Sequence, residues 1–222
     1  MNKETKSKLA IFDTFKTKNQ DLTGEAKRQR AIISILGGKG NPAERTRTGI
    51  SQKIAKKQNI TWKNIYSGIF RDLDEILLPM KIAEEDGRLP LKRGPKALQE
   101  KGIPYYHLTK KGLLVKLAIN GIENMESQME EFFSQLNPKE KEFEKILAKL
   151  MKNSPNFTYS IFQKYVRAFC EEKIEELLPF DLSKLQEITD ENLIVQKEVV
   201  LAFGKLSSQE KKDAILFLEK IT

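Results

Sequence analysis

The chain has 222 residues, of which 39% are hydrophobic, so it is long enough for one large globular domain or two small ones. No apolar run approaches the roughly 20 residues that a membrane-spanning helix requires, and the start lacks the apolar core of a signal peptide, so we expect a soluble protein that stays inside the cell. A single cysteine, Cys170, cannot form an internal disulfide, and with one histidine in the whole chain the sequence offers no zinc-binding pattern.

The formal charge of +8 is unevenly distributed along the chain. Residues 1–119 contain 25 Lys and Arg against 12 Asp and Glu, a balance of +13, whereas residues 120–222 contain 14 against 19, a balance of −5. An excess of cations confined to one half indicates that this half meets a polyanion. Nucleic acid is the leading candidate, because the cations are spread over several short elements and do not line one long amphipathic helix suited to a membrane surface.

Two helices are predicted at the start of the basic half. The first opens with Thr23 as its cap and closes at the glycine pair 37–38. The run RTRT at 45–48 alternates as a short strand would. A second helix is expected over 49–60, where isoleucine and alanine recur at helical spacing.

A third helix is predicted after a tight turn at 59–61, with Thr61 as its N-cap. Apolar residues recur through it every three or four positions, which predicts a stripe facing the core. The stripe consists of Ile65, Ile69, Leu73 and Ile76.

A β-hairpin is predicted next, from a strand at 77–83 and a second strand at 103–108, IPYYHL, that is rich in aromatic and β-branched residues. Because side chains alternate across a strand, we expect Tyr106 and Leu108 inside. Thr109 then caps a fourth helix beginning KKGLLVKLAI.

Beyond residue 119 every predicted element is a helix, with start signals such as the Asn137 cap and the capping box of Ser207 and Glu210. The predicted organisation is an N-terminal extension over 1–22, a domain over 23–119 and a helical domain over 120–222. The core of the helical domain is expected to contain Phe143, Ile146, Leu150, Phe162, Tyr165, Phe169, Phe203 and Phe217.

Three helices, two hairpin strands and the run YHLTKKG at 106–112 follow in an order that resembles the winged helix-turn-helix domain of archaeal and bacterial transcription regulators. The resemblance covers about Thr23 to Ile119 and rests on element order plus the aromatic-x-Leu-Thr-x-x-Gly pattern. It implies a mainly α fold, in which a winged helix-turn-helix of three helices and a β-hairpin wing precedes an all-helical C-terminal domain. It also implies that the third helix enters the DNA major groove and that the wing touches the flanking backbone.

The third helix, with its apolar stripe buried, would turn polar side chains outward. Asn and Arg can make paired hydrogen bonds to adenine and guanine edges, each worth roughly 1–3 kcal/mol of discrimination. The predicted base-reading residues are Trp62, Lys63, Asn64, Ser67 and Arg71. The alternative is an ordinary solvated helix face, with Trp62 packed on Tyr66.

Further cations surround this helix and are expected to contact DNA phosphates, so that binding weakens as salt rises. They are Arg45, Arg47, Lys53, Lys56, Lys57, Arg88, Lys92, Arg93, Lys96 and Lys101. The hairpin connection is long for a wing, and the acidic run EEDG at 84–87 lies where DNA should pass. A protein contact is therefore an alternative role for the wing.

A possible dimer seam follows the fourth helix. Apolar residues at alternating steps of three and four are typical of a coiled coil, which would place two recognition helices on successive turns of DNA. The seam residues are Val115, Ala118, Ile122, Met125, Met129, Phe132 and Leu136. The alternative is burial against later helices of the same chain, with Asn120 and Gly121 breaking the helix.

No nucleophile, carboxylate pair or metal-ligand cluster is recognisable, so we expect no enzymatic activity, no cofactor and no metal. The predicted function is a cytoplasmic, nucleoid-associated transcription regulator that binds double-stranded DNA sequence-specifically as a homodimer, with a possible protein partner for the acidic helical domain and no membrane contact. The alternative is an architectural or machinery-associated nucleic-acid-binding protein whose acidic helices dock onto a larger assembly. RNA is a weaker candidate, because the chain lacks an aromatic sheet platform for stacking bases.

Overall fold

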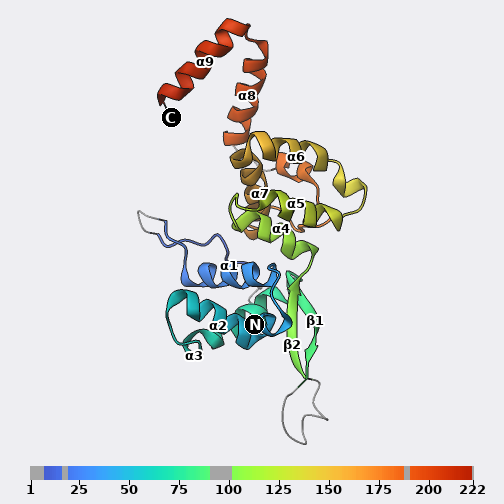
Figure 1. Cartoon of the computed structure of the whole chain (residues 1–222). Coiled ribbons are helices and arrows are strands. Elements are labelled where there is room, and N and C mark those ends of the chain that lie inside the picture. Colours follow the sequence, from blue (N-terminus) through green and yellow to red (C-terminus); the bar gives the residue numbers. More distant parts are fainter. Residues whose placement is uncertain (1–7, 17–19, 91–101, 188–190, 222) are drawn as a thin grey trace, which may run out of the picture. The chain divides into compact units, whose positions relative to one another are not determined.

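The computed structural model describes residues 8–16, 20–90, 102–187 and 191–221 (Figure 1). Its N-terminal elements are α1 (Gly24–Leu36), η1 (Pro42–Arg45), α2 (Arg47–Gln58), α3 (Lys63–Arg71), η2 (Asp72–Leu77), β1 (Ala83–Leu89) and β2 (Ile103–Leu108). Those that follow are α4 (Lys110–Ile119), α5 (Met125–Ser134), η4 (Lys139–Lys141), α6 (Glu144–Asn153), α7 (Pro155–Cys170), η5 (Leu182–Glu187), α8 (Glu191–Lys205) and α9 (Ser208–Ile221).

The predicted fold class is confirmed. Three helices precede an antiparallel β-hairpin, and the described residues after it form helices only, which is the layout expected of a winged helix-turn-helix followed by a helical region (Figure 1). The chain divides into two compact units, at 1–185 and 186–222. The expected boundary at 119/120 lies inside the first unit, because α4 packs against both α1 and α7.

Two helices of the first unit begin with the same local device, a threonine cap followed by glycine three residues later. The Thr109 hydroxyl accepts the Gly112 N–H at 3.2 Å and donates to the Lys81 carbonyl at 2.6 Å, which ties α4 to the chain before β1. A Cβ on Gly112 would lie 2.1 Å from the Ile82 carbonyl oxygen, so only glycine fits. The run YHLTKKG therefore marks the point where the hairpin is fixed to α4.

The second example of this device corrects the short strand predicted at 45–48. The Thr46 hydroxyl accepts the Gly49 N–H at 3.0 Å and donates to the Ala43 carbonyl at 2.9 Å, so Thr46 caps α2. Its backbone forms only an isolated bridge with Tyr105, while Arg45 ends η1 and Arg47 begins α2.

The third helix continues through η2 as a π-helix, and this changes which residues face the core. Ile69 and Leu73 are fully buried, as predicted. The wider π turn then advances the buried position by one residue, so Leu77 is buried in place of Ile76, and Asp72 is drawn inside. Trp62, rather than Thr61, occupies the N-cap position.

The first strand lies later than expected. Residues 78–82 form turns, and β1 begins at Ala83. It pairs with β2 from Ala83 opposite Leu108 to Leu89 opposite Ile103, with a bulge between Glu85 and Gly87. β2 lies where the sequence placed it.

The inner face of the hairpin is as predicted, because Tyr106 and Leu108 are buried. Burial raises the pKa of the Tyr106 phenol.

Residues 9–12 of the N-terminal extension belong to the core. Leu9 and Ile11 are buried to 1% and 0% exposure. The buried Gln29 side chain of α1 accepts the Ala10 N–H at 2.9 Å, and the Arg30 guanidinium donates to the Ile11 carbonyl at 2.7 Å. Charged and amide side chains of α1 thus satisfy backbone groups that this buried segment cannot pair with itself.

The continuous dimer seam is not formed. The helix stops at Ile119, Gly121 adopts a φ of +75°, and a new helix starts at Met125. Apart from the exposed Ile122, the predicted seam residues are buried within the first unit: Val115, Ala118, Met125, Met129, Phe132 and Leu136. The alternative of burial against later helices of the same chain is therefore correct.

An aromatic cluster centred on Phe180 forms the core of α5 and α7. The ring of Phe180 lies 5.4 Å from that of Phe132, 5.9 Å from Phe133, 6.1 Å from Phe162 and 5.3 Å from Tyr165. Burial raises the pKa of Tyr165 to about 12, and its hydroxyl donates to the Leu177 carbonyl at 3.2 Å.

Two residues predicted for this helical core lie on the surface instead. Ile146 of α6 is 49% exposed and Phe217 of α9 is 61% exposed. Of the other residues predicted there, Phe162 and Tyr165 are buried and the remainder are half-buried: Phe143, Leu150, Phe169 and Phe203.

Among the described residues, no helix combines the length and apolar character that crossing a bilayer requires.

Candidate nucleic-acid interface

The connection between α2 and α3 is a tight turn that fixes the start of α3. Asn59 adopts the left-handed conformation with φ 53°, which asparagine tolerates better than most residues. The N–H groups of Asn59 and Ile60 both donate to the Ala55 carbonyl, the latter at 3.0 Å. The turn predicted at 59–61 is confirmed, and the chain reverses there so that α3 packs against α2.

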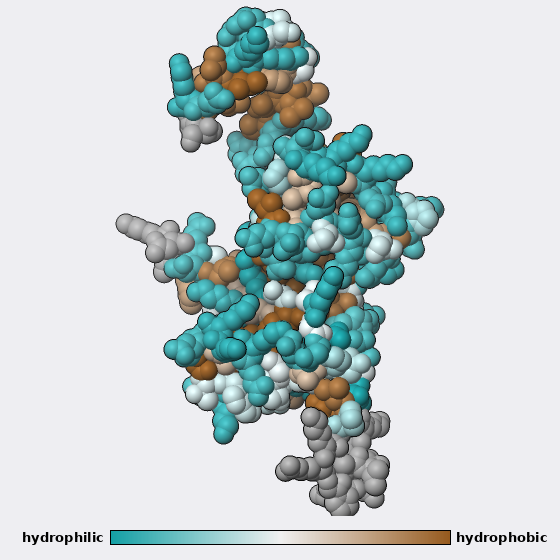
Figure 2. All heavy atoms as spheres, in the orientation of Figure 1, coloured by the Kyte–Doolittle hydropathy of each residue, from teal (hydrophilic) through white to brown (hydrophobic). Residues whose placement is uncertain are grey.

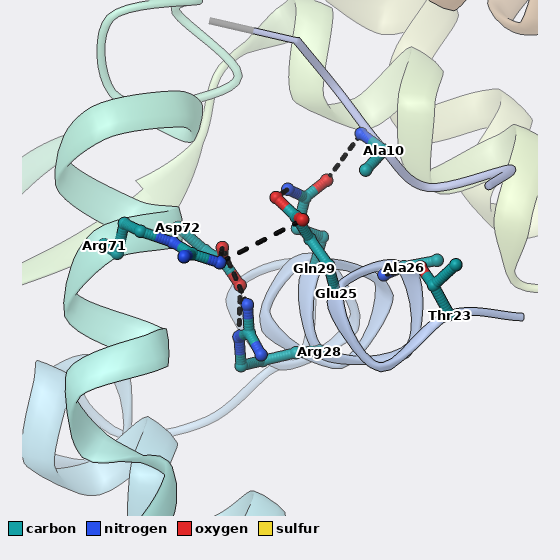
Figure 3. Close-up of polar contacts among 8 residues, drawn as sticks. All are labelled: Ala10, Thr23, Glu25, Ala26, Arg28, Gln29, Arg71 and Asp72. Atoms are coloured by element: carbon teal, nitrogen blue, oxygen red, sulfur yellow. Dashed lines mark hydrogen bonds and ion pairs between the residues drawn. The ribbon is translucent and has the colours of Figure 1, made fainter.

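A buried ion pair anchors the other end of α3 (Figure 3). The guanidinium of Arg28 on α1 donates two hydrogen bonds to the Asp72 carboxylate, the Nη2–Oδ1 contact measuring 3.1 Å. Asp72 is completely buried, and the side chain of Arg28 is 21% exposed. A Cβ on Gly68 would lie 3.0 Å from Arg28 Nε, so the missing side chain leaves the space through which the guanidinium reaches Asp72.

The face of α3 opposite these anchors is exposed, and we call it the α3 outer face. At about 100° per residue, its members fall on one side of the helix. They are Lys63, Asn64, Ser67, Phe70 and Arg71. Four of them were predicted from the sequence, and the fifth, Phe70, is 45% exposed. An aromatic ring amid polar groups fits contact with a thymine methyl group, as apolar side chains make in the major groove.

Two predicted readers lie at the margins of this surface. Trp62 is half-buried and packs edge-on against Tyr66, with ring centroids 5.7 Å apart, which is the packing alternative considered for it. Arg71 is 53% exposed, but its Nη2 lies 4.0 Å from Glu25 and 3.9 Å from Asp72 (Figure 3). Asn64 and Ser67 are therefore the exposed, uncharged polar positions of the face.

Arg45 connects η1 to the hairpin. Its Nη1 lies 3.0 Å from Asp86, the residue that the β1 bulge leaves unpaired, and its guanidinium lies 5.3 Å from the centroid of the Tyr105 ring. These contacts hold the wing against the helices. They also engage the Arg45 guanidinium, which the sequence predicted to contact a DNA phosphate.

Arg47 is held in the same way at the start of α2. Its Nη2 lies 2.6 Å from Asp74, and its guanidinium lies 5.0 Å from the centroid of Phe70 and 5.4 Å from that of Tyr106. The side chain is 26% exposed. A planar cation between two rings and a carboxylate contributes to packing as well as charge balance.

Two more of the predicted phosphate contacts are paired with carboxylates. Lys53 contacts Glu44, and Arg88 makes two hydrogen bonds to Glu85, at 2.6 and 2.9 Å, which raise the pKa of Arg88. Both pairs are solvent-accessible, so each contributes little to stability. The predicted contacts Lys92, Arg93, Lys96 and Lys101 lie outside the described residues.

The remaining predicted cations lie beside the turn. Lys56 and Lys57 lie in the last turn of α2 and Lys63 begins α3, and all three are exposed. None forms an ion pair within the described part of the chain. Together with the α3 outer face they make a cationic, hydrogen-bonding surface around one helix end.

Sequence patterns gave no indication of two structural residues at this site. Asp72 is close to Asp74 and Glu75 in the sequence, as on a solvent-exposed helix face, and it is the π turn that places it inside. Arg28 reads as one of several cations in α1.

Within residues 8–16, 20–90, 102–187 and 191–221, no group of three or more His, Cys, Asp or Glu is placed to hold a metal ion.

Comparison with known proteins gives no relative on which to base a function. No family model matches the chain, and neither does any curated protein or solved structure.

Proposed function

We propose that this protein binds double-stranded DNA through the α3 outer face and regulates transcription at specific sequences. The element order supports this, because the second helix of a helix-turn-helix is the one that enters the major groove. The observation that carries the proposal is local. Asn64 and Ser67 project to solvent on this face, next to three lysines that form no ion pair among the described residues.

Each group on this surface has a distinct role. The Asn64 amide can pair with both the N6 and N7 edges of adenine, and the Ser67 hydroxyl can donate to or accept from either base type. Lys56, Lys57 and Lys63 would contact phosphates, which positions the protein without reading sequence. The ion pairs of Arg45 and Arg47 keep the hairpin and η2 in register with α3.

The pairing of cations sets the expected salt dependence. Ten phosphate contacts would give a slope of log K against log salt near −9, whereas the six predicted contacts that remain when the four paired cations are set aside would give about −5. We therefore expect moderate affinity that falls with salt less steeply than the sequence implied.

Selection from a random duplex pool at moderate salt tests the proposal. We expect the protein to enrich one sequence motif. Asn64→Ala should relax the preference at one position by about 1–3 kcal/mol, because a bidentate base contact is lost. Lys57→Ala is the matched control on the same surface. It should weaken binding to all duplexes alike and lower the salt slope by about 0.9.

An architectural or machinery-associated role is the second candidate. Two observations favour it: four of the predicted phosphate contacts are occupied by carboxylates, and the second unit carries a large exposed apolar surface. If the pool yields no enriched motif and Asn64→Ala lowers affinity no more selectively than Lys57→Ala, this candidate replaces the first.

A further inference from the structure

The second unit exposes an unusual amount of apolar surface, visible as brown spheres over α8 and α9 (Figure 2). No described side chain of these two helices is buried. The exposed apolar residues used in this argument, each between 46% and 69% accessible, are Ile194, Val195, Val199, Val200, Leu201, Ile215, Leu216 and Phe217.

Apolar residues occupy several sides of α8, so one neighbouring helix cannot cover them all. At about 100° per residue, Val195 and Val199 lie on one side, whereas Ile194 and Leu201 lie on another, about 100° or more away. A helix with apolar residues all round is normally buried in a core. Between α8 and α9, the Lys211 amine lies 5.9 Å from the centroid of the Phe203 ring.

The two helices are also too short to persist unsupported. α8 has 15 residues and α9 has 14, and isolated helices of about 12–15 residues are marginal in water. Most helical stability in proteins comes from packing an apolar face. A stable α8–α9 pair therefore requires a partner surface.

A second copy of the same pair meets this requirement. The exposed fractions above amount to about four and a half fully exposed residues, or roughly 800 Å² per copy, which equals the area that each partner buries in a stable interface. Residues 191–221 contain five acidic and five basic side chains, so two copies carry no net charge that would repel. Isologous pairing would bring four helices around one apolar core.

We propose that the chain dimerises through α8 and α9, forming a four-helix assembly from two copies. This assigns dimerisation to residues 191–221 and not to the predicted seam at 115–136. It does not depend on DNA binding. If both proposals hold, the selected DNA motif will be a pair of half-sites, and if only DNA binding holds, it will be a single half-site.

Light scattering of the full chain without DNA tests the dimer. We expect about 51 kDa at micromolar concentration, twice the 25.5 kDa of one chain. Leu201→Glu combined with Phe217→Glu should weaken association by about 100-fold or more, because two charges would be buried in each half of the interface. Ser208→Glu, which adds one negative charge at the exposed first residue of α9, away from the apolar positions, should leave the dimer intact.

Hydrogen exchange of the wild-type chain provides a test that needs no variant. Amides of α8 and α9 should become more protected as protein concentration rises through the dissociation constant. A wild-type chain that stays at 25.5 kDa would overturn the proposal, whether α8 and α9 are protected by their own chain or remain open. A dimer unaffected by the paired glutamates, or one whose α8 and α9 protection is independent of concentration, would also overturn it.

Discussion

Replacing Arg28 by alanine is expected to lower the free energy of unfolding of the first unit by about 3–5 kcal/mol. The change removes both Arg28 hydrogen bonds to the Asp72 carboxylate, which has no exposed surface, and leaves it beside the more distant Arg71 guanidinium, 3.9 Å away. Because Asp72 begins the π segment that follows α3, the substitution should also loosen the end of the proposed recognition helix. Urea unfolding followed by fluorescence of Trp62, the only tryptophan, reports directly on this region.

Controls separate the ion pair from general effects of substitution. Lys27→Ala, at the exposed neighbouring position of α1, should change stability by no more than about 0.5 kcal/mol. Arg28→Met combined with Asp72→Leu should recover most of the loss, since it leaves no buried charge unpaired. If Arg28→Ala alone costs less than about 1 kcal/mol, the ion pair is not what fixes α3 to α1.

Replacing Phe180 by alanine is expected to cost a similar amount, about 3–5 kcal/mol, for a different reason. The ring touches four other aromatic rings from α5 and α7, so its removal leaves a cavity that rigid neighbours cannot fill. The backbone N–H of Phe180 also donates to Glu140 at 2.9 Å, which ties the segment after α7 to η4. Calorimetry of the full chain measures the loss as a lower transition temperature.

Phe15→Ala is the matched control, because Phe15 is 52% exposed and loses little packing on truncation. Phe180→Leu should fall between the two, as it keeps part of the volume. An equal effect of Phe180→Ala and Phe15→Ala would show that the aromatic cluster does not hold this helical region together.

The helices and the hairpin were predictable because their signals are local. Thr23, Thr46 and Thr109 each precede a helix and accept an N–H from its first turn, although the sequence placed the start of α2 two residues too late. Alternation in β2 correctly placed Tyr106 and Leu108 inside. Side-chain spacing of this kind depends only on neighbouring residues, so it can be recognised from the sequence alone.

Features set by tertiary contacts were not predictable. The π turn at 72–77 shifts the buried position from Ile76 to Leu77. The regular spacing of apolar residues along the helix gives no sign of this turn. The heptad-like spacing from Val115 to Leu136 marks two separate buried faces, because Gly121 interrupts the helix between them. Apolar spacing predicts burial but not the partner that covers it.

The candidate site was predictable in outline only. Residue types and spacing predict the exposed face of α3, including Asn64 and Ser67, and both residues are exposed in the structure. The same reasoning treated four cations as available to phosphates: Arg45, Arg47, Lys53 and Arg88. Each of them instead forms an ion pair, Arg88 with a carboxylate three residues away and the other three with carboxylates farther along the chain. A count of cations cannot reveal which of them already have partners.

The most direct test of the central claim is an amide chemical-shift titration of the full chain with a duplex of about 20 base pairs at moderate salt. If α3 is the DNA-binding element, the largest shifts will map to Lys63, Asn64 and Ser67, with smaller ones at Lys56 and Lys57. Shifts confined to α4–α7, or no shift at saturating duplex, would contradict the account.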